Sequence, residues 1–557
     1  MTPRMKLILE YKHFFKNNLP NDRLEIIKNI PKRNLIFEIA GLNYRLKSYK
    51  RLKYDVSLET QYKELQYFCP IDKNLLDFYL YVFDKYVTKD NYPIVFNRAA
   101  NLFALEELVN ASGLIEVDDS FQMNKIVVWD NIFRYLLAVN SEIVKIKPIP
   151  PQNITLENIS ASAIALNELM IEDNPISTAY RGMKLLEYFL KDPTYGLELE
   201  CYFEKVIKIE KERFIYNILS ICMANGQMNS DLEFIYKHEK QDAFLDLLSN
   251  GSISNSNPIT LLRIKKNPLF KDSDNLHVLL DINFLVSKSY NFLLNDFWFD
   301  FLKPQINDIG KEKYNYMHYR AVFGLFFENY IEEIIINSFH HLKHPAPLLF
   351  DELKINTPDG QIEIADIYIR QNKKVLVGQV KSSSIYDKEK YSGDIDTLYK
   401  NDREKFFKDF GVNQTYESIK RILKYSKSFD SGLKSTKRIE FFPLVIVNDK
   451  IFQTPLIPNL LHSRFQELLA TENFAPHIIN PLVVMNVSDL EYLENSLAKK
   501  KTTIWDILKS HYKKIEKSLM PPFIHTADRF IEPDAITKRV TEPIISIINK
   551  YHEPTTN

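Results

Sequence analysis

The chain has 557 residues, of which 45% are hydrophobic and 26% charged, and its 72 basic side chains balance 72 acidic ones. The length exceeds that of one ordinary domain, and the composition is typical of soluble globular proteins rather than disordered or fibrous ones. The balanced charge excludes binding of nucleic acid through the overall field of the molecule. Any such affinity must come from local patches.

The cysteine content and the N-terminal sequence indicate in which cellular compartment the protein is expected. The three cysteines, Cys69, Cys201 and Cys222, lie far apart, which indicates neither a disulfide framework nor a zinc site. The N-terminal stretch MTPRMKLILEYKHFF has no apolar run long enough for a signal peptide, and no segment has the apolar length needed to cross a bilayer. We therefore expect a cytoplasmic protein with no membrane association.

Residues 1–300 are expected to form a mainly helical N-terminal region of unknown function, with strand-like pieces such as Lys125–Trp129. Proline-rich and Ser/Asn-rich breaks suggest sub-boundaries near residues 150 and 255. The basic stretch Asn43–Lys53 contains interleaved tyrosines, which fits a nucleic-acid surface or, more commonly, a solvated face of a helix or strand. No other motif in this region points to chemistry.

Residues 301–515 read as a second domain that mixes helices and strands. In chain order we expect a helix over 320–339, strands over 348–355, 362–369 and 375–381, helices within about 395–428, and a strand over 438–447. Residues 481–508 add a strand and two helices, with Ser488 as an N-cap and Glu491 completing a capping box. Residues 516–557 form a C-terminal extension that is expected to wrap the surface or fray.

The strands expected over 362–369 and 375–381 carry polar residues in apolar surroundings. Successive side chains of a strand point to opposite faces, so Gln379 and Lys381 share one face of the second strand. An amide and an ammonium are costly to bury unless they are paired, and Asp366 on the neighbouring strand is the natural partner. Acid, amide and amine converging at one strand end can hold a divalent metal, a phosphate and a water.

This pattern resembles the core of the PD-(D/E)xK nuclease superfamily, in which an acid on one strand precedes a (D/E)xK element on the next. Gln379 stands where most members have Asp or Glu, so the chain is similar to a QxK variant, and the order of expected elements matches the family's αβββαβ order. The resemblance implies an α/β fold: a restriction-endonuclease-like mixed sheet flanked by helices, C-terminal to the mainly helical region.

The resemblance also implies roles for individual residues. Asp366 would be the principal metal ligand, the Gln379 amide oxygen and the Val380 carbonyl would complete the set, and Glu328 on the preceding helix would supply further negative charge. Lys381 would orient the attacking water. Further downstream, Gln414 and Ser383 would contact the substrate. Hard oxygen ligands favour Mg²⁺, with Mn²⁺ as a substitute.

By this resemblance we expect a metal-dependent endonuclease, acting on DNA in restriction or antiviral defence, as a homodimer or with partner defence proteins. Two alternatives stay open. Asp359, in the literal Pro358-Asp359-Gly360 sequence, is an alternative first acid, although that triplet is foremost a turn signal. The Gln379 substitution is also compatible with a silenced nuclease fold that serves as a non-catalytic nucleic-acid-binding or assembly module.

Overall fold

The structure is a computed structural model of the whole chain. It describes residues 5–552 except 17–18, 49–52, 69–71, 90, 113, 116–123, 144–167, 170, 172–173, 225–233, 238–241, 250–260, 274, 344–346, 359, 385–406, 435, 455, 516–520 and 532–535. The chain divides into two compact units that do not follow chain order. Unit 1 comprises residues 1–148 and 207–296, and unit 2 comprises residues 149–206 and 297–557.

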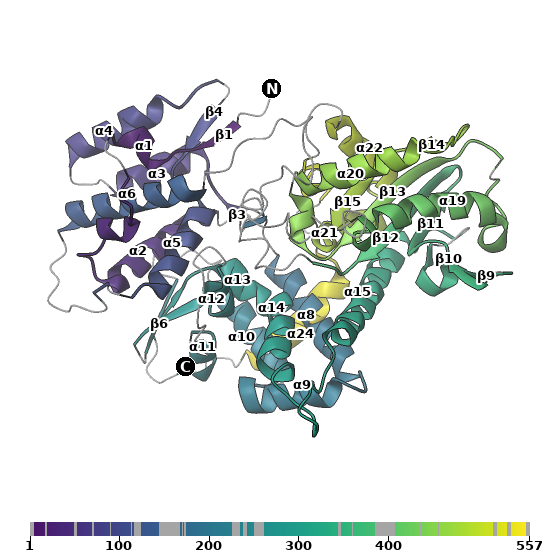
Figure 1. Ribbon diagram of the computed structural model, residues 1–557, viewed down its shortest axis with the longest axis horizontal. Coiled ribbons are helices and arrows are strands. Elements are labelled where there is room, and N and C mark those ends of the chain that lie inside the picture. Colours follow the sequence, from purple (N-terminus) through teal and green to yellow (C-terminus); the bar gives the residue numbers. More distant parts are fainter. Residues whose placement is uncertain are drawn as a thin grey trace. The chain divides into compact units, whose positions relative to one another are not determined.

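Unit 1 is mostly helical (Figure 1). Its helices of ten or more residues, among those described, are α2 (Lys32–Arg45), α3 (Leu58–Phe68), α4 (Lys73–Asp84), α5 (Arg98–Asn110), α6 (Lys125–Ile143) and α10 (Lys211–Ala224). Small sheets accompany them: β1 (Met5–Ile8) pairs with β4 (Asn91–Ile94), β2 (Lys47–Ser48) with β3 (Lys53–Tyr54), and β7 (Leu276–Leu279) lies between β5 (Ile235–Lys237) and β6 (Leu269–Ser273). The expectation of a mainly helical region is confirmed.

The strand expected at Lys125–Trp129 is wrong, because these residues open helix α6, which continues to Ile143. The local run of β-branched residues favours a strand, but Val128, Trp129, Ile132 and Phe133 recur at helical spacing and are all buried. Packing along the nineteen residues of α6 therefore overrides the β-strand propensity of the five residues Lys125–Trp129.

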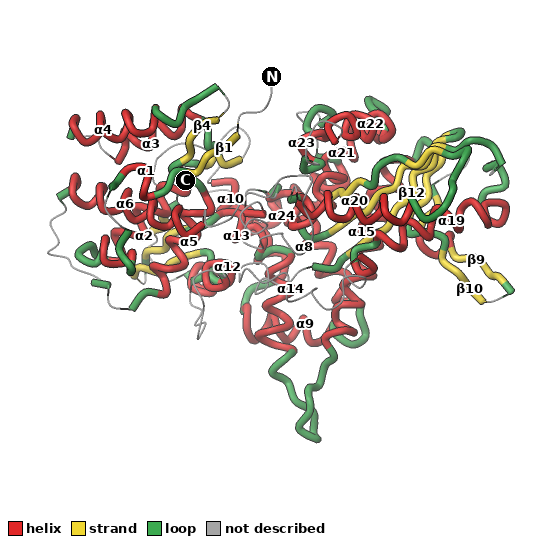
Figure 2. Tube along the Cα trace, turned by 45° about the horizontal axis from the view of Figure 1, so that its top comes forward, coloured by secondary structure: helices red, strands yellow, loops and turns green. Residues whose placement is uncertain are grey.

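The central feature of unit 2 is a six-stranded mixed sheet with the order β14-β13-β12-β11-β8, in which β15 also pairs with β13 (Figure 2). Its strands are β8 (Leu348–Leu349), β11 (Ile367–Gln371), β12 (Lys374–Lys381), β13 (Glu440–Val447), β14 (Ile478–Ile479) and β15 (Val483–Asn486). Strand β12 is antiparallel to β11 and parallel to β13. The expected α/β character of this part of the chain is confirmed.

One face of the sheet packs against α19 (Val412–Phe429) and α20 (Leu456–Leu469). Their shared core includes Val375, Val377, Phe441, Val445, Tyr416, Ile419, Ile422, Leu461 and Phe465. On the other face lie α15 (Tyr316–Phe339), α21 (Val487–Ala498) and α22 (Ile504–Ile515), and Phe442 meets the ring of Trp505 at 4.9 Å. The apolar residues of α15 that recur at helical spacing are all buried: Phe323, Phe327, Tyr330, Ile331, Ile334 and Ile335.

The two strands expected before residue 370 are each split in the structure. Residues 348–355 form β8, a 3-10 turn (Phe350–Leu353) and the start of β9 (Lys354–Thr357), whereas residues 362–369 contribute to both β10 (Gly360–Glu363) and β11. Within the described part of the chain, β9 and β10 pair only with each other, as an antiparallel hairpin outside the main sheet. The apolar alternation shifts by one residue between Ile364 and Ile367, and this is where the chain leaves the hairpin and enters the main sheet.

Buried ion pairs connect the helices of unit 2. Arg181, on α8 (Pro175–Leu190), binds both carboxylate oxygens of Glu491 on α21 at 2.8 and 3.0 Å, and the Tyr330 hydroxyl of α15 donates to the same carboxylate at 2.7 Å. Arg539, on α24 (Lys538–Tyr551), binds Glu494 at 2.8 and 2.9 Å. The C-terminal extension is therefore anchored by this helix.

The expected cap at Ser488 is wrong, because α21 begins two residues earlier than that cap would place it. Asn486 is the N-cap, its side chain accepts the Ser488 amide at 3.0 Å, and Asp489 completes the capping box. Glu491 has a different task, the buried pair with Arg181. Among the described residues, no helix is both long enough and apolar enough to cross a bilayer.

We predict that Arg181→Met lowers the free energy of unfolding of unit 2 by about 3 kcal/mol, because it leaves the Glu491 carboxylate buried without its cation. Hydrogen exchange of α8 and α21 amides in urea measures the loss. Lys184→Met on the same helix is the matched control: its partners are Glu187 and Glu333, the Lys184 side chain is 29% exposed, and the expected loss is below about 1 kcal/mol. Equal losses in the two variants would contradict the assignment.

Candidate active site

Asp366 lies where the pairing of β11 with β12 ends. The last paired residues are Ile367 and Gly378, so the next amide of β12 that points toward β11, that of Val380, has no strand partner there. The Asp366 carboxylate takes this place and accepts the Val380 N–H at 2.7 Å. The side chain is thereby held at the strand end, and the residue is only 7% exposed.

Gln379 and Lys381 point to the side of β12 where helix α19 begins, as their shared face predicts. The Gln379 amide nitrogen donates to Ser418 Oγ at 3.2 Å, which leaves its oxygen on the side away from Ser418. Gly411 precedes α19 with a φ of +80°, and a Cβ there would lie 3.0 Å from Lys381 Cε. The Lys381 ammonium is 3.8 Å from Asp366 Oδ2.

Helix α15 approaches the end of β12 along one stripe. Arg320 donates from Nη2 to the Ser382 carbonyl at 2.9 Å, and a Cβ on Gly324 would meet Ser382 Oγ at 3.5 Å. Glu328 follows at the next helical turn on the same stripe and is half-buried. The docking of α15 therefore presents the Glu328 carboxyl toward the strand end that carries Asp366 and Lys381.

The acids near this strand end have perturbed protonation. Burial raises the pKa of Asp366, although Lys381 and the Val380 amide work against it. Burial, and then the negative charge of Asp366, raise the pKa of Glu328 to about 7. Burial and the charge of Asp366 also raise the pKa of Glu363, at the end of β10. Carboxyls that repel one another in a partly buried place are typical of functional sites, because a bound cation relieves the repulsion.

The structure brings together Asp366, Lys381, Glu328 and the Val380 backbone, and places Gln379 beside Lys381. It does not bring Gln414 or Ser383 to them by any hydrogen bond among the described residues; the Gln414 side chain is exposed on α19. Asp359, the alternative acid, lies outside the described residues.

Two residues near the site were not expected from the sequence. Glu363 precedes Asp366 by three positions, and only the break between β10 and β11 brings its carboxyl near Asp366. Gly411 makes room for Lys381. A glycine directly before a helical run is a recognisable signal for a special backbone conformation, but its proximity to Lys381 is a tertiary property.

The donor set is compatible with a hard cation. No three His, Cys, Asp or Glu side chains in the described ranges gather closely enough to hold a metal ion by themselves. Two carboxylates, Asp366 and Glu328, together with the amide oxygen of Gln379 and the Val380 carbonyl, provide oxygen atoms only. Mg²⁺ suits such a set, because it accepts one or two carboxylates and keeps several of its waters.

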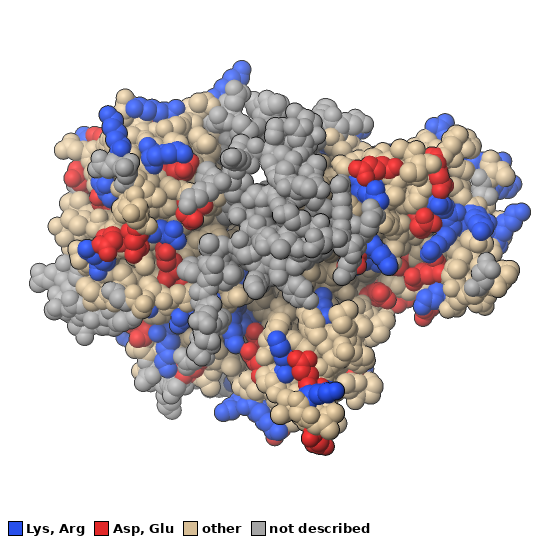
Figure 3. All heavy atoms as spheres, viewed as in Figure 1, with Lys and Arg blue, Asp and Glu red and all other residues tan. Residues whose placement is uncertain are grey.

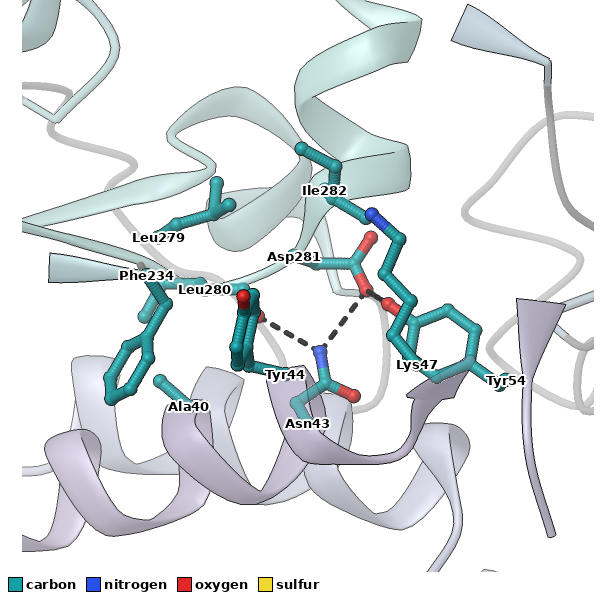
Figure 4. Close-up of a pocket in the computed structure, with 10 residues that line it drawn as sticks. All are labelled: Ala40, Asn43, Tyr44, Lys47, Tyr54, Phe234, Leu279, Leu280, Asp281 and Ile282. Atoms are coloured by element: carbon teal, nitrogen blue, oxygen red, sulfur yellow. Dashed lines mark hydrogen bonds between the residues drawn. The ribbon is translucent and has the colours of Figure 1, made fainter. Parts of the chain in front are cut away.

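A second group of polar side chains lines a small pocket in unit 1 (Figure 4). The Asn43 amide donates to the Leu280 carbonyl at 3.0 Å and to Asp281 at 3.2 Å, and Tyr54 also donates to Asp281. Arg98 neutralises Asp281 through two bonds of 2.7 and 2.8 Å, which helps to hold the pKa of this buried carboxyl low.

The residues that line this pocket include the beginning of the basic stretch Asn43–Lys53. Asn43, Tyr44 and Lys47 are buried, and Arg45 pairs with Glu64 at 3.0 Å. The described beginning of the stretch is therefore neither a nucleic-acid surface nor a solvated face, and both interpretations are wrong for these residues. Residues 49–52 lie outside the described part of the chain.

Comparisons with protein-family models, with curated proteins and with solved structures find no match to this chain.

We predict that Glu328 makes stability fall as pH rises between about 4.5 and 7. The folded protein retains a proton that the unfolded chain loses near the usual value of 4.5, so the folded state binds more protons in this window and loses stability toward higher pH. Glu328→Gln removes this dependence and should raise the free energy of unfolding at pH 8 by about 1–2 kcal/mol, given partial solvent screening. Urea unfolding at a series of pH values measures it; parallel profiles would refute the assignment.

We further predict that Gly411→Ala destabilises the protein more than Gly310→Ala does. Both glycines have positive φ, which costs an alanine about 1–2 kcal/mol, but a Cβ at Gly310 meets open space. At Gly411 the new methyl group would crowd Lys381 and the Cβ of Gln379, which lies at 3.3 Å. Thermal unfolding of the two variants isolates this contact as the difference between them, and an equal loss would argue against it.

Proposed function

We propose that unit 2 is a metal-dependent nuclease that hydrolyses phosphodiester bonds in DNA. The observation that carries the proposal is the meeting of Asp366, Lys381 and Glu328, which are distant in sequence, at one end of β12. Phosphodiester hydrolysis needs a cation to neutralise the phosphate, a positioned water and a route for protons. Acid, amine and a carboxyl with a pKa of about 7 supply the protein's share of these requirements.

The topology of the sheet supports a restriction-endonuclease-like core of the PD-(D/E)xK type. Helix α15 precedes the strands, β11 and β12 are antiparallel and carry the acid and the QxK element, and β13 follows α19 in parallel to β12. This is the helix and strand order of the superfamily that the sequence resembles. Because fold alone does not fix function, the site residues carry more weight than the topology.

Asp366, Glu328, the Gln379 amide oxygen and the Val380 carbonyl would hold Mg²⁺, with Mn²⁺ as a substitute. The ion would supply Lewis-acid stabilisation of the charge that develops on the phosphate. Lys381, held near Asp366 by their charges, orients the attacking water and stabilises the same negative charge. Glu328, whose ionised form a bound cation would favour, would ligate the ion directly or hold a water bound to it.

Exposed cations beyond α19 support a nucleic-acid substrate. Between Lys424 and Arg438 the exposed charged residues described are all basic, because Asp430 is buried in a pair with Arg370. Figure 3 shows Lys and Arg gathered at the end of unit 2 that carries α19, with acids interspersed nearby. Such a run binds phosphates without reading bases. DNA is proposed by the resemblance, as are a cytoplasmic location and a role in restriction or antiviral defence.

A second function, a nucleic-acid-binding or assembly module with a silenced site, has one observation in its favour. The Gln379 amide is already hydrogen-bonded to Ser418, and an amide ligates a hard cation more weakly than a carboxylate. The two functions differ in whether DNA is cut. A double-strand cut by single sites would also require two copies of the chain, or a partner protein.

We predict that the purified protein nicks plasmid DNA in the presence of Mg²⁺ or Mn²⁺, and that chelation of the metal abolishes nicking. Asp366→Ala and Lys381→Ala should each lower the cleavage rate at least about 1,000-fold, because the first removes the principal ligand of the cation and the second removes the amine that stabilises the charge on the phosphate. Gel electrophoresis of plasmid incubated with each protein measures the rates.

Asp409→Ala is the control for this assay, because it removes an exposed acid of unit 2 that has no part in the site. It should cleave at the wild-type rate. Cleavage that survives in Asp366→Ala would refute the site, and retardation of DNA without metal-dependent cutting by the wild type would favour the silenced module.

A further inference from the structure

The hairpin of β9 and β10 has two chemically different faces. Across the hairpin Ile355 pairs with Ile362, whereas Asn356 pairs with Gln361 and Lys354 with Glu363. The side chains of a strand alternate, so the two isoleucines occupy one face, and the four polar residues occupy the other. Ile355 is 9% exposed, and both isoleucines pack against the core of unit 2. The polar face is turned to solvent.

The hairpin extends beyond the main sheet of unit 2 as a separate two-stranded ribbon (Figures 1 and 2). Asn356 and Gln361 are exposed, and neither side chain has a hydrogen-bond partner among the described residues. Their amides are therefore available, side by side, at the centre of the polar face. Each amide offers a donor and an acceptor in one plane.

The polar face of the hairpin continues into the proposed active site. Glu363 belongs to the face, and its carboxyl is close enough to Asp366 for the two charges to interact. The Glu363 carbonyl accepts a hydrogen bond from Arg421 of α19, the helix that leads to the exposed cations. A duplex whose backbone lies at Asp366 and on those cations would therefore bring the edges of its bases to this face.

We propose that the polar face of the β9–β10 hairpin lies in the major groove of duplex DNA and reads adenine through Asn356 and Gln361. This inference rests on the proposed nuclease function and adds sequence preference to it. A two-stranded ribbon fits the major groove, which is about 12 Å wide, and paired strands lie about 5 Å apart. Asn and Gln amides match the N6 and N7 positions of adenine.

The position of the hairpin limits where the reading occurs. Gln361 precedes Asp366 by five residues, which span at most about 17 Å of extended chain. With about 3.4 Å between successive bases of a strand, the adenine lies within about five base pairs of the cut. We expect this preference to be about tenfold to hundredfold over other bases.

Two experiments with full-length protein test the inference. In the first, Asp366→Asn protein, with the hairpin either intact or carrying Asn356→Ala and Gln361→Ala, selects duplexes from a random-sequence library in Ca²⁺. In the second, catalytically intact protein with the same two hairpins cuts the library in Mg²⁺, and the ends are sequenced. Gln466→Ala, an exposed amide on α20, is the control.

Enrichment of adenine with the intact hairpin and with Gln466→Ala, and its loss in the double variant, supports the inference. Gln361→Arg should then shift the preference toward guanine, because Arg matches guanine O6 and N7. Cutting without base preference, or with a preference that the double variant retains, overturns the hairpin's role and leaves the nuclease intact. A third outcome is adenine enrichment that depends on the hairpin, together with no cutting by the catalytically intact protein. In that case the hairpin reads DNA but the nuclease proposal fails.

Discussion

The candidate site depends on one hydrogen bond, from the Val380 amide to the Asp366 carboxylate. It satisfies a backbone donor that the end of β11 leaves without a strand partner, and it fixes an acid at the same point. The bond also opposes the effect of burial on the carboxyl, because it favours the ionised form. Asp366 is thus bound into the sheet by its backbone and by its side chain. The Asp366 carboxylate that completes the hydrogen bonding of the sheet is therefore the same group that can bind a cation. The fold needs no further backbone strain to place it there.

Glu328, the second acid of the site, is positioned by contacts that other residues of its helix make. Glu328 belongs to α15, which is fixed by contacts on both sides of Glu328: Arg320 binds the chain beyond β12, and Tyr330 joins the buried pair of Arg181 and Glu491. Buried ion pairs contribute little net stability, but they tolerate few alternative arrangements, since a misplaced partner leaves a charge unpaired. We infer that this network sets the rotation of α15, and with it the position of the Glu328 carboxyl.

Sequence patterns predicted the parts of unit 2 that long, regular runs define. Strand β12 and helix α15 were expected close to their observed bounds, because β12 is a short apolar run bounded by polar residues and α15 is a long segment whose buried apolar residues recur at helical spacing. The division of residues 362–369 between β10 and β11 was missed, although the apolar alternation shifts by one residue between Ile364 and Ile367. The cap of α21 was missed because Asn486 with Asp489 competes with Ser488 and Glu491 for the same pattern. Burial of Asn43 could not be predicted, because its partner Asp281 is 238 residues away.

The discontinuity of unit 2 has a consequence for how the chain folds during synthesis. Helix α8 leaves the ribosome with Arg181 and the apolar side chains of its inner face, but Glu491 follows only 310 residues later. At about 5–20 residues per second this interval is on the order of 15–60 s. For that time Arg181 has no counter-ion, although α9 (Gly196–Tyr202) and α15, which also pack against α8, have already been translated. Completion of the sheet that carries Asp366 therefore does not complete the unit, which closes only after α21 and α24 have been translated.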